Sequence, residues 1–422
     1  MIIERGNTKL NNEEAIKFSP NTKFMVDKDY AIVINRIEGL WVKIPKDCEE
    51  MLRQCDKLGY SISYLMNSLV DDEDRTYMSK IIKVLEEIKV LGYEEKNSRL
   101  HDISFAITNR CNLHCKHCMV NADKCDIKEN FTTKEIINAL DKIIEAKPEA
   151  ITITGGEPLV RPDFIKIIKY LKNNYNGKIG LMTNATLITE NNINDIISCV
   201  SSIDISIDGV DEKSCSIIRG KGVFEKVVSA IKLLKEHNFN EITTSMVLSA
   251  NNEPLVDKFF QLNEDLGVNG ILRALSFVGQ AKTNEELLRK EFQSEEKKSS
   301  QKLKDMHNSD KFHSCTCAAG CKTLTIENDG NIYPCNLFIE EEHKLGNIMD
   351  INNIKDILVC DKNKFLSKSL QKYEPDSMEK CKECNVRYFC WSCLHQIVDV
   401  EEDGIFDKRC QYMKKLLQPA YE

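Results

Sequence analysis

The sequence predicts an α/β protein whose central part alternates strands with helices. Three observations support this prediction. Strand-like apolar runs alternate with amphipathic helical stretches over residues 101–282, a group of three strands and three helices precedes them, and 13 of the 18 cysteines fall in three clusters. Strands that alternate with helices pair in parallel through right-handed crossovers. A chain of 422 residues is too long to form one hydrophobic core, so we expect several domains.

Residues 1–98 are expected to form a small winged-helix-like domain, with Asp74 as the N-cap and Gly92 as the C-cap of its last helix. This order of elements is that of a winged helix-turn-helix, so DNA binding is the first function to consider for the domain. The domain carries 15 Lys and Arg against 18 Asp and Glu. A DNA-binding domain needs a basic surface, so this acidic balance argues against DNA binding. The expected strands are residues 22–26, 30–35 and 39–44, and the expected helices are residues 46–58, 62–68 and 74–91.

The central domain, residues 101–282, is expected to hold six parallel strands. Residues 283–314 are highly charged and are expected to form a helix and linker, and residues 315–422 form a cysteine-rich C-terminal domain. The expected strands are residues 103–108, 151–154, 179–183, 203–207, 242–248 and 270–275, and the clearest helices between them are residues 133–146, 162–174 and 224–237.

Composition narrows the class of protein. Hydrophobic residues make up 42% and charged residues 29%, which is typical of a globular protein, and the net charge of −8 gives no general attraction to nucleic acid or an anionic membrane. Neither a signal peptide nor an apolar run of membrane-spanning length is visible, so we expect a cytoplasmic protein without a membrane partner. Cysteines in such a chain indicate metal binding or catalysis rather than disulfides.

Two motifs carry the chemistry. The first is Cys111-x3-Cys115-x2-Cys118 after the first strand of the central domain, and the second is Gly155-Gly156-Glu157-Pro158 at the end of the next strand. Three thiolates can hold a [4Fe-4S] cluster and leave one iron open, whereas electron-transfer clusters normally have four cysteines. A zinc site completed by His114, His117 or Cys125 is the alternative, but zinc does not require the second motif.

The cysteine spacing, with the aromatic His117 before the last cysteine, resembles the CxxxCxφC motif of the radical S-adenosylmethionine (SAM) enzymes. The resemblance implies that Cys111, Cys115 and Cys118 hold the catalytic cluster and that SAM chelates its open iron. An electron from the cluster would then cleave SAM to a 5′-deoxyadenosyl radical. Gly155, Gly156, Glu157 and Pro158 match the motif that receives the methionine amine, since glycine permits a close approach. The six units match the partial (β/α)6, TIM-like barrel of this family, with ligands at the strand ends.

Polar residues follow later strands of the expected barrel. Asn184 ends the third strand, Ser206 and Asp208 end the fourth, and Arg219 follows in a loop closed by Gly220. By resemblance these positions correspond to SAM contacts, in which hydroxyl, amide and carboxylate groups bind ribose and Arg binds the SAM carboxylate. Ordinary turn formation is the alternative for Asn184 and Asp208.

The C-terminal cysteines resemble a SPASM domain, an extension that binds two auxiliary iron-sulfur clusters. The spacing is Cys315-x5-Cys321, Gly330-x4-Cys335, Cys381-x2-Cys384-x5-Cys390-x2-Cys393 and Cys410. The resemblance assigns Cys315, Cys321, Cys335 and Cys393 to the first cluster, and Cys381, Cys384, Cys390 and Cys410 to the second. Cys390 and Cys393 are one residue closer together than usual, and Cys317 could replace Cys315. An auxiliary iron could therefore be open, and zinc is again the alternative.

The N-terminal outline also resembles the RiPP recognition element, which captures the leader of a ribosomally made peptide by adding it to a sheet edge. A structural cap on the barrel is the alternative. Together the resemblances imply a peptide maturase that forms cysteine thioethers of the sactipeptide or ranthipeptide kind, with a precursor peptide and a flavodoxin- or ferredoxin-type electron donor as partners. The alternative reactions are peptide epimerisation and carbon-carbon cross-linking. The alternative class of protein is a metal-binding winged-helix redox regulator. Asn336 stands where SPASM enzymes that oxidise a sulfatase residue have an aspartate that acts as a base. An amide cannot take up a proton as a carboxylate can, which disfavours sulfatase maturation.

Overall fold

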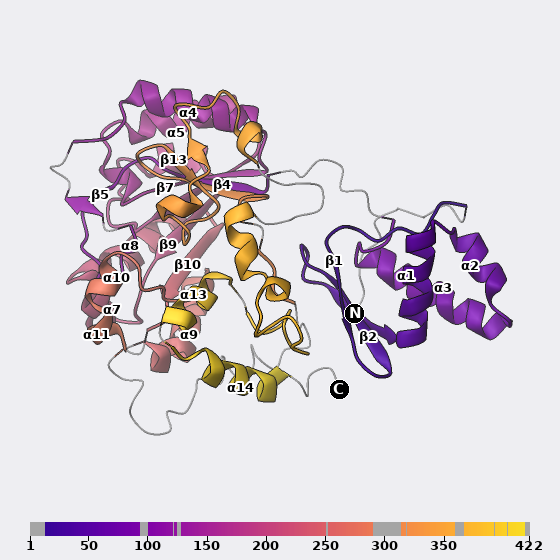
Figure 1. The fold of residues 1–422 in the computed structure, drawn as a ribbon. Coiled ribbons are helices and arrows are strands. Elements are labelled where there is room, and N and C mark those ends of the chain that lie inside the picture. The colour runs from indigo at the N-terminus through magenta and orange to yellow at the C-terminus, as the bar shows by residue number, and fades with distance from the viewer. Residues whose placement is uncertain are drawn as a thin grey trace. The chain divides into compact units, whose positions relative to one another are not determined.

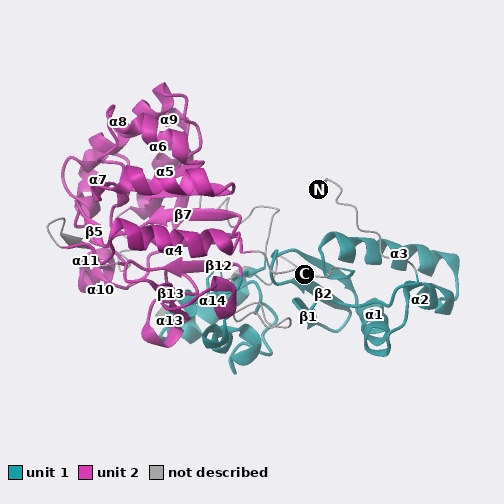
Figure 2. Ribbon diagram, turned by 90° about the horizontal axis from the view of Figure 1, so that it is seen from above, with its two compact units in different colours: residues 1–98, 311–321, 359–422 teal, residues 99–310, 322–358 magenta. Residues whose placement is uncertain are grey.

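The computed structural model describes residues 13–92, 100–120, 122–124, 128–249, 252–289, 314–317, 319–358, 367–391, 393–402 and 404–417. The chain divides into two compact units (Figure 2). The smaller one contains residues 1–98, 311–321 and 359–422, and the larger one contains residues 99–310 and 322–358. Residues 322–358 thus join the barrel unit, although the sequence places them with the cysteine-rich domain.

A nine-stranded sheet forms the centre of the larger unit within the described residues, in the order β11-β10-β9-β8-β7-β4-β12-β13-β14 (Figure 1). The six expected parallel strands are confirmed, with ends that differ by a few residues. They are β4 (Asp102–Ala106), β7 (Ala150–Thr154), β8 (Lys178–Thr183), β9 (Ser202–Ser206), β10 (Ile242–Val247) and β11 (Asn269–Arg273).

The three expected helices of this unit are confirmed as α4 (Thr133–Glu145), α5 (Phe164–Asn174) and α8 (Val223–Glu236). Figure 1 shows α4 and α5 side by side outside the sheet. Three further helices, α6 (Ile193–Cys199), α7 (Glu212–Arg219) and α9 (Val256–Leu266), complete the crossovers between the later strands. Their apolar residues and alternate residues of the strands form one core.

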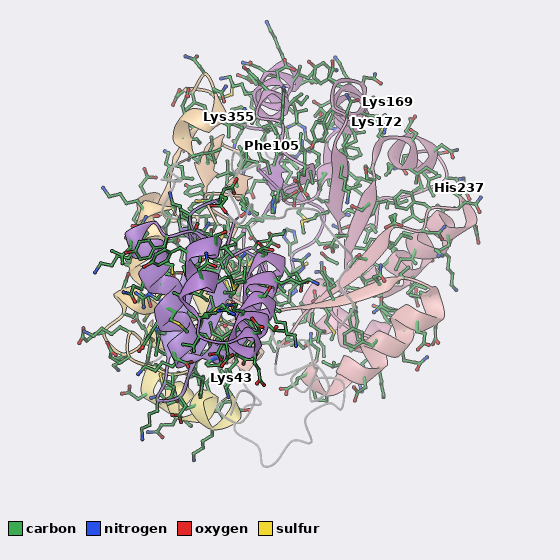
Figure 3. The ribbon with its side chains drawn as sticks, turned by 90° about the vertical axis from the view of Figure 1, so that its right-hand side faces the viewer. Lys43, Phe105, Lys169, Lys172, His237 and Lys355 are labelled. Atoms are coloured by element: carbon green, nitrogen blue, oxygen red, sulfur yellow. The ribbon has the colours of Figure 1, made fainter. Side chains whose placement is uncertain are left out.

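Phe105 of β4 illustrates this packing, because it is fully buried while Lys169 and Lys172 of α5 lie exposed at the surface (Figure 3). The strand residues between the buried ones, such as Ser104 and Asp204, face the other side of the sheet and are partly exposed. The parallel strands therefore pack helices on one face of the sheet and present partly exposed residues on the other.

A C-terminal hairpin extends the same sheet. β12 (Thr323–Ile326) pairs in parallel with β4, and β13 (Asn331–Tyr333) and β14 (Gly346–Asn347) follow antiparallel. This pairing explains why residues 322–358 belong to the barrel unit. The remaining short elements are β5 (Arg110–Cys111) paired with β6 (Asp123–Lys124), α10 (Gln280–Thr283), α11 (Glu285–Arg289), and 3-10 turns at Pro158–Val160, Glu253–Leu255, Glu341–His343 and Ile354–Ile357.

The N-terminal part of the smaller unit has the expected three strands and three helices. The strands β1 (Thr22–Val26), β2 (Tyr30–Asn35) and β3 (Trp41–Pro45) form an antiparallel sheet with β2 in the middle. The helices α1 (Lys46–Leu58), α2 (Ile62–Ser68) and α3 (Asp72–Glu87) follow, and their apolar faces build a core with the sheet.

The expected ends of α3 are wrong. Asp71, not Asp74, is the N-cap, because its carboxylate accepts the Asp74 N–H at 2.8 Å. The helix ends before Gly92, because Lys89 adopts a positive φ of 59° that interrupts the helical backbone.

The C-terminal part of this unit consists of loops with 3-10 turns at Lys368–Tyr373 and Pro375–Ser377 and the helices α13 (His395–Glu402) and α14 (Phe406–Leu417). Of the expected linker, residues 290–313 lie outside the described residues, as do Cys125 and Cys360. In the part of the chain that is described, no helix has the length and apolar character of a membrane span.

Candidate functional site

The first cysteine motif lies in the loop that follows β4. Cys111 ends β5 and is buried, whereas Cys115 and Cys118 are partly exposed. The Leu113 N–H donates to Cys111 Sγ at 3.4 Å, and the Cys118 N–H donates to the Cys115 carbonyl at 3.2 Å. Burial raises the pKa of the Cys111 thiol to about 12, and the neighbouring Glu157, Cys115 and Cys118 add to this effect. The loop therefore gathers three thiols that need a cationic partner to ionise.

The glycines of the second motif let two loops meet at backbone distance. Gly155 has φ 144°, and a Cβ placed there would lie 2.2 Å from the Thr108 carbonyl oxygen. A Cβ on Gly156 would lie 2.4 Å from the Arg110 carbonyl oxygen. The Gly156 N–H donates to the Thr108 carbonyl and the Glu157 N–H to the Arg110 carbonyl, both at 2.9 Å. The motif thus fixes the start of the cysteine loop, and only glycine fits.

Glu157 is fully buried, and its carboxylate joins this motif to the end of β8. Its oxygens accept the Thr183 hydroxyl at 2.7 Å and the N–H groups of Asn184 at 2.7 Å and Leu159 at 3.1 Å. Burial raises the pKa of Glu157, and the bonds from Asn184 and Thr183 oppose that effect. Pro158 follows as the first residue of a 3-10 turn that Glu157 caps. The role of Glu157 in receiving the methionine amine stays a prediction.

Asn184 forms the turn that was its alternative, and it also reaches the cysteine loop, so its SAM contact stays a prediction. Its Nδ2 donates to Asn112 Oδ1 at 2.9 Å and lies 3.9 Å from Cys111 Sγ. Its Oδ1 accepts the Thr186 N–H at 3.0 Å and the Thr186 hydroxyl at 2.6 Å. The amide is therefore held in one orientation beside the first thiol of the motif.

Asp208 and Arg219 form a buried ion pair that also includes His117. Asp208 Oδ2 lies 2.6 Å from Arg219 Nε and 2.6 Å from His117 Nε2, and Asp208 Oδ1 accepts the Val247 N–H at 2.7 Å. Burial alone would raise the pKa of Asp208, but Arg219 and His117 outweigh burial and hold this pKa well below its usual range. Arg219 Nη1 also lies 3.7 Å from Cys115 Sγ. A cation is thus fixed beside the second thiol of the motif.

Arg219 was expected in a loop, and this expectation is wrong. It is the last residue of α7, because Asp211 and Ser214 form a capping box that starts a helix after β9. Ser206 ends β9 beside Ser245 of β10 and is partly exposed, as a ligand contact requires, but its contact with ribose stays a prediction.

Sequence reasoning missed several residues of this site. His117 was expected as the aromatic residue of the motif or as a zinc ligand, yet it is a partner of Asp208, which is 91 residues away. Gly279 was not singled out, although the following Gln280 N–H donates to the Cys118 carbonyl at 2.8 Å and a Cβ on Gly279 would lie 2.3 Å from the Met119 oxygen. The tight approach at Gly279 leaves no trace in the sequence except an isolated glycine.

The cysteines assigned to the second auxiliary cluster converge. Cys381, Cys384, Cys390 and Cys410 line one small cavity, together with Trp391 and the cations Lys380, Arg387 and Lys414. Burial, with smaller effects of the neighbouring Cys410 and Cys384, raises the pKa of Cys381 to about 11. Four thiols that line the same small cavity are the ligand set of an iron-sulfur cluster, which is held by cysteine thiolates.

The cysteines assigned to the first auxiliary cluster are divided between the units. Cys315, Cys321 and Cys393 belong to the smaller unit and Cys335 to the larger one. Cys321 is buried and disulfide-bonded in this structure, so its assignment as a ligand requires the reduced thiol and stays a prediction. Cys315 is firmly placed, since its N–H donates to the Tyr388 carbonyl at 2.6 Å and its Sγ accepts the Trp391 N–H at 2.9 Å.

Comparison with known proteins identifies two domains in this chain. Residues 105–257 match the radical SAM superfamily, and residues 315–385 match the SPASM iron-sulfur cluster-binding domain. Mycofactocin maturase MftC from Mycobacterium tuberculosis is 25% identical over 300 residues, which cover 67% of this chain and 75% of MftC. The subtilosin biosynthesis protein AlbA from Bacillus subtilis is 27% identical over 275 residues, which cover 62% of this chain and 60% of AlbA.

The fold agrees with a solved structure of the same class. Streptococcus suis SuiB bound to S-adenosylmethionine superposes with a TM-score of 0.53 at 14% identity, over 90% of this chain and 96% of SuiB. The radical SAM family model and the maturase relatives decide between an enzyme and a metal-binding regulator in favour of the enzyme. The chain therefore contains a radical SAM domain, whose cofactors are a [4Fe-4S] cluster and SAM, and a SPASM domain that binds auxiliary iron-sulfur clusters.

Proposed function

We propose that the protein matures a ribosomally made precursor peptide by forming thioether bonds between cysteine sulfur and unactivated carbon. The observation that carries this proposal is the combination, in one chain, of a three-strand, three-helix N-terminal domain with the SAM-cluster motif and a four-thiol cavity. MftC is named a maturase, AlbA is named for the biosynthesis of the bacteriocin subtilosin, and SuiB has been solved bound to the precursor peptide SuiA, which supports a peptide substrate.

The N-terminal sheet offers one edge for a leader peptide. Its two outer strands are β1 and β3. Arg387 Nη2 donates to the Phe24 carbonyl of β1 at 3.0 Å, and Lys23 of β1 pairs with Asp376 at 2.6 Å, so C-terminal residues already contact β1. At β3, C-terminal residues contact the Trp41 ring and the Gly39 carbonyl just before the strand, so we favour addition of the leader as a further strand beside the later residues of β3.

The residues around the barrel motifs have separate tasks. With its cofactors bound, this site supplies a 5′-deoxyadenosyl radical that removes a hydrogen atom from the peptide. Arg219 offers a fixed cation for the SAM carboxylate, while Asn184 and Ser206 offer polar groups at neighbouring strand ends. Closing a thioether removes a second hydrogen from the cysteine thiol as a proton and an electron, and the auxiliary clusters would accept that electron.

The proposal is tested by co-expressing the enzyme with a short cysteine-containing peptide encoded beside it and weighing the product. Each thioether lowers the mass by two hydrogens and removes one thiol from alkylation. A triple variant of Cys111, Cys115 and Cys118 to Ala should give unmodified peptide, whereas Cys199→Ala, at a buried cysteine outside the clusters, should retain modification.

Other outcomes of the same assay would overturn thioether formation. Loss of two hydrogens with all thiols still alkylated would indicate carbon-carbon cross-linking, and unchanged mass with an inverted α-carbon would indicate epimerisation. The electron donor of flavodoxin or ferredoxin type and the cytoplasmic location stay predictions.

A further inference from the structure

A groove between α2 and α3 of the N-terminal domain has no part in the site described above. Its volume of about 560 Å³ suits a small ligand or a few residues of a peptide rather than a single ion. Ile62 and Met66 of α2 give the groove an apolar part, and hydroxyl and amide side chains line much of the rest. Arg75, Lys80 and Lys83 of α3 add three positive charges, and none of the described residues that line the groove is acidic. The lining therefore suits a partly apolar, negatively charged ligand.

The part of α3 that lines the groove is separate from the part that builds the domain core. Met78, Ile82 and Leu85 are buried in that core, whereas Lys80 and Lys83 are exposed. Side chains three or four positions apart lie on one side of a helix, so the two lysines are neighbours and the buried residues lie elsewhere. The lysines are thus not needed for packing, and their charges are accessible to a partner.

Lys80 and Lys83 supply the uncompensated charge of the groove. Arg75 is already engaged, because it donates to two carbonyls at the end of α2 and its Nη1 lies 2.6 Å from Asp72 Oδ1. Neither lysine forms an ion pair with any residue that the structure describes. Like charges three positions apart on a helix repel each other, so this arrangement is unfavourable until an anion lies beside it. The helix itself thus favours an anionic partner at this position.

The charge of the groove is opposite to that of its surroundings. Residues 1–98 carry 15 Lys and Arg against 18 Asp and Glu, so the domain as a whole repels an acidic ligand. A nucleic acid needs a broad basic surface, which this balance does not give. A short acidic stretch of peptide needs only the local patch that Lys80 and Lys83 provide, and its carboxylates would complement their charge.

We propose that the groove between α2 and α3 is a second docking site for the precursor peptide, in which Lys80 and Lys83 bind an acidic segment of the leader. The inference rests on the proposed function, because it assumes a leader that the N-terminal domain captures. α3 also packs against β3, the strand beside which the leader is expected to add. Strand addition uses main-chain hydrogen bonds, whereas the groove adds selectivity for the charge of the leader.

The affinity of the leader for the full-length holoenzyme tests the role of the two lysines. The probe is the fluorescein-labelled leader of the peptide encoded beside the enzyme, and its binding is followed by fluorescence anisotropy at low ionic strength. The double variant Lys80→Gln with Lys83→Gln should weaken binding about fivefold, because each exposed ion pair contributes only modestly. The difference should shrink as added salt screens the charges. A leader with its Asp and Glu residues replaced by Asn and Gln should bind the wild type and this variant equally.

Lys28→Gln with Lys57→Gln is the matched control. These exposed lysines lie in the turn between β1 and β2 and in the last turn of α1, so the control removes the same charge outside the groove. It should keep nearly the wild-type affinity. If both double variants weaken binding equally, the net charge of the domain is the cause and the groove proposal is overturned. Equal affinity of the wild type and the Lys80, Lys83 variant would also overturn it.

Mass analysis of the same precursor peptide separates the groove from the proposed function on which it rests. A precursor that the wild-type enzyme modifies, and whose leader binds the Lys80, Lys83 variant as tightly as the wild type, overturns the groove alone. A modified precursor whose leader has no acidic residue does the same. A peptide that neither binds nor is modified overturns the proposed function and the groove with it.

Discussion

Replacing Asp208 with Asn tests the electrostatics of the SAM-binding side of the barrel. Asp208 is fully buried between Arg219 and His117, with both contacts at 2.6 Å. Asn keeps the shape and can still accept the Val247 N–H, but it leaves the Arg219 charge buried without a counter-charge. Removing one member of such a pair costs about 3–5 kcal/mol. For a unit of this size the apparent melting temperature should fall by about 10 °C.

The assay is thermal unfolding of anaerobically purified protein, with Asp204→Asn as the matched control. Asp204 also pairs with an arginine, Arg273, but the two side chains are 21% and 40% exposed, so its loss should cost less than about 1 kcal/mol. The double variant Asp208→Asn with Arg219→Met should lose less than the sum of the two single variants, because neither charge is then left alone. A melting temperature of Asp208→Asn equal to that of Asp204→Asn would refute this reasoning.

Two further predictions concern the close backbone contact at Gly155 and the ionisation of Glu327. Gly155→Ala should lower stability by more than about 2 kcal/mol in denaturant unfolding, because its Cβ would overlap the Thr108 carbonyl, and wild-type stability would contradict the described loop. Burial and the neighbouring Asp329 raise the pKa of Glu327 to about 7, so its contribution to stability is complete below pH 4.5 and is lost as pH rises through 7. Glu327→Gln should therefore gain about 2 kcal/mol more stability relative to wild type at pH 8 than at pH 5, and an equal difference at both pH values would contradict the raised pKa.

Much of the fold could be predicted because its strands and long helices have strong periodicity. The six barrel strands were placed to within a few residues, since each is a short apolar run between turn-forming residues. The short helices α6 and α7 were missed because seven or eight residues give too little periodicity. The N-cap of α3 was misplaced because Asp71, Asp72 and Asp74 are equally suitable cap residues in the sequence.

The chemistry of the site could be predicted from spacing, but its supporting contacts could not. Cys111, Cys115 and Cys118 are close in the chain, so their convergence is local. The contact of Asp208 with His117 joins residues that lie 91 positions apart in the sequence. No single-sequence pattern encodes such a pair, because it depends on how the sheet and loops pack.

The pairing of β12 with β4 has a consequence for the synthesis of the chain. β4 is the first strand of the barrel to leave the ribosome, and its partner on one side, β12, follows on the order of 200 residues later. Until then β4 exposes backbone donors and acceptors at an edge, which is a known hazard for aggregation and a source of slow folding. Nascent chains that stop before residue 326 should therefore depend on chaperones more than full-length ones.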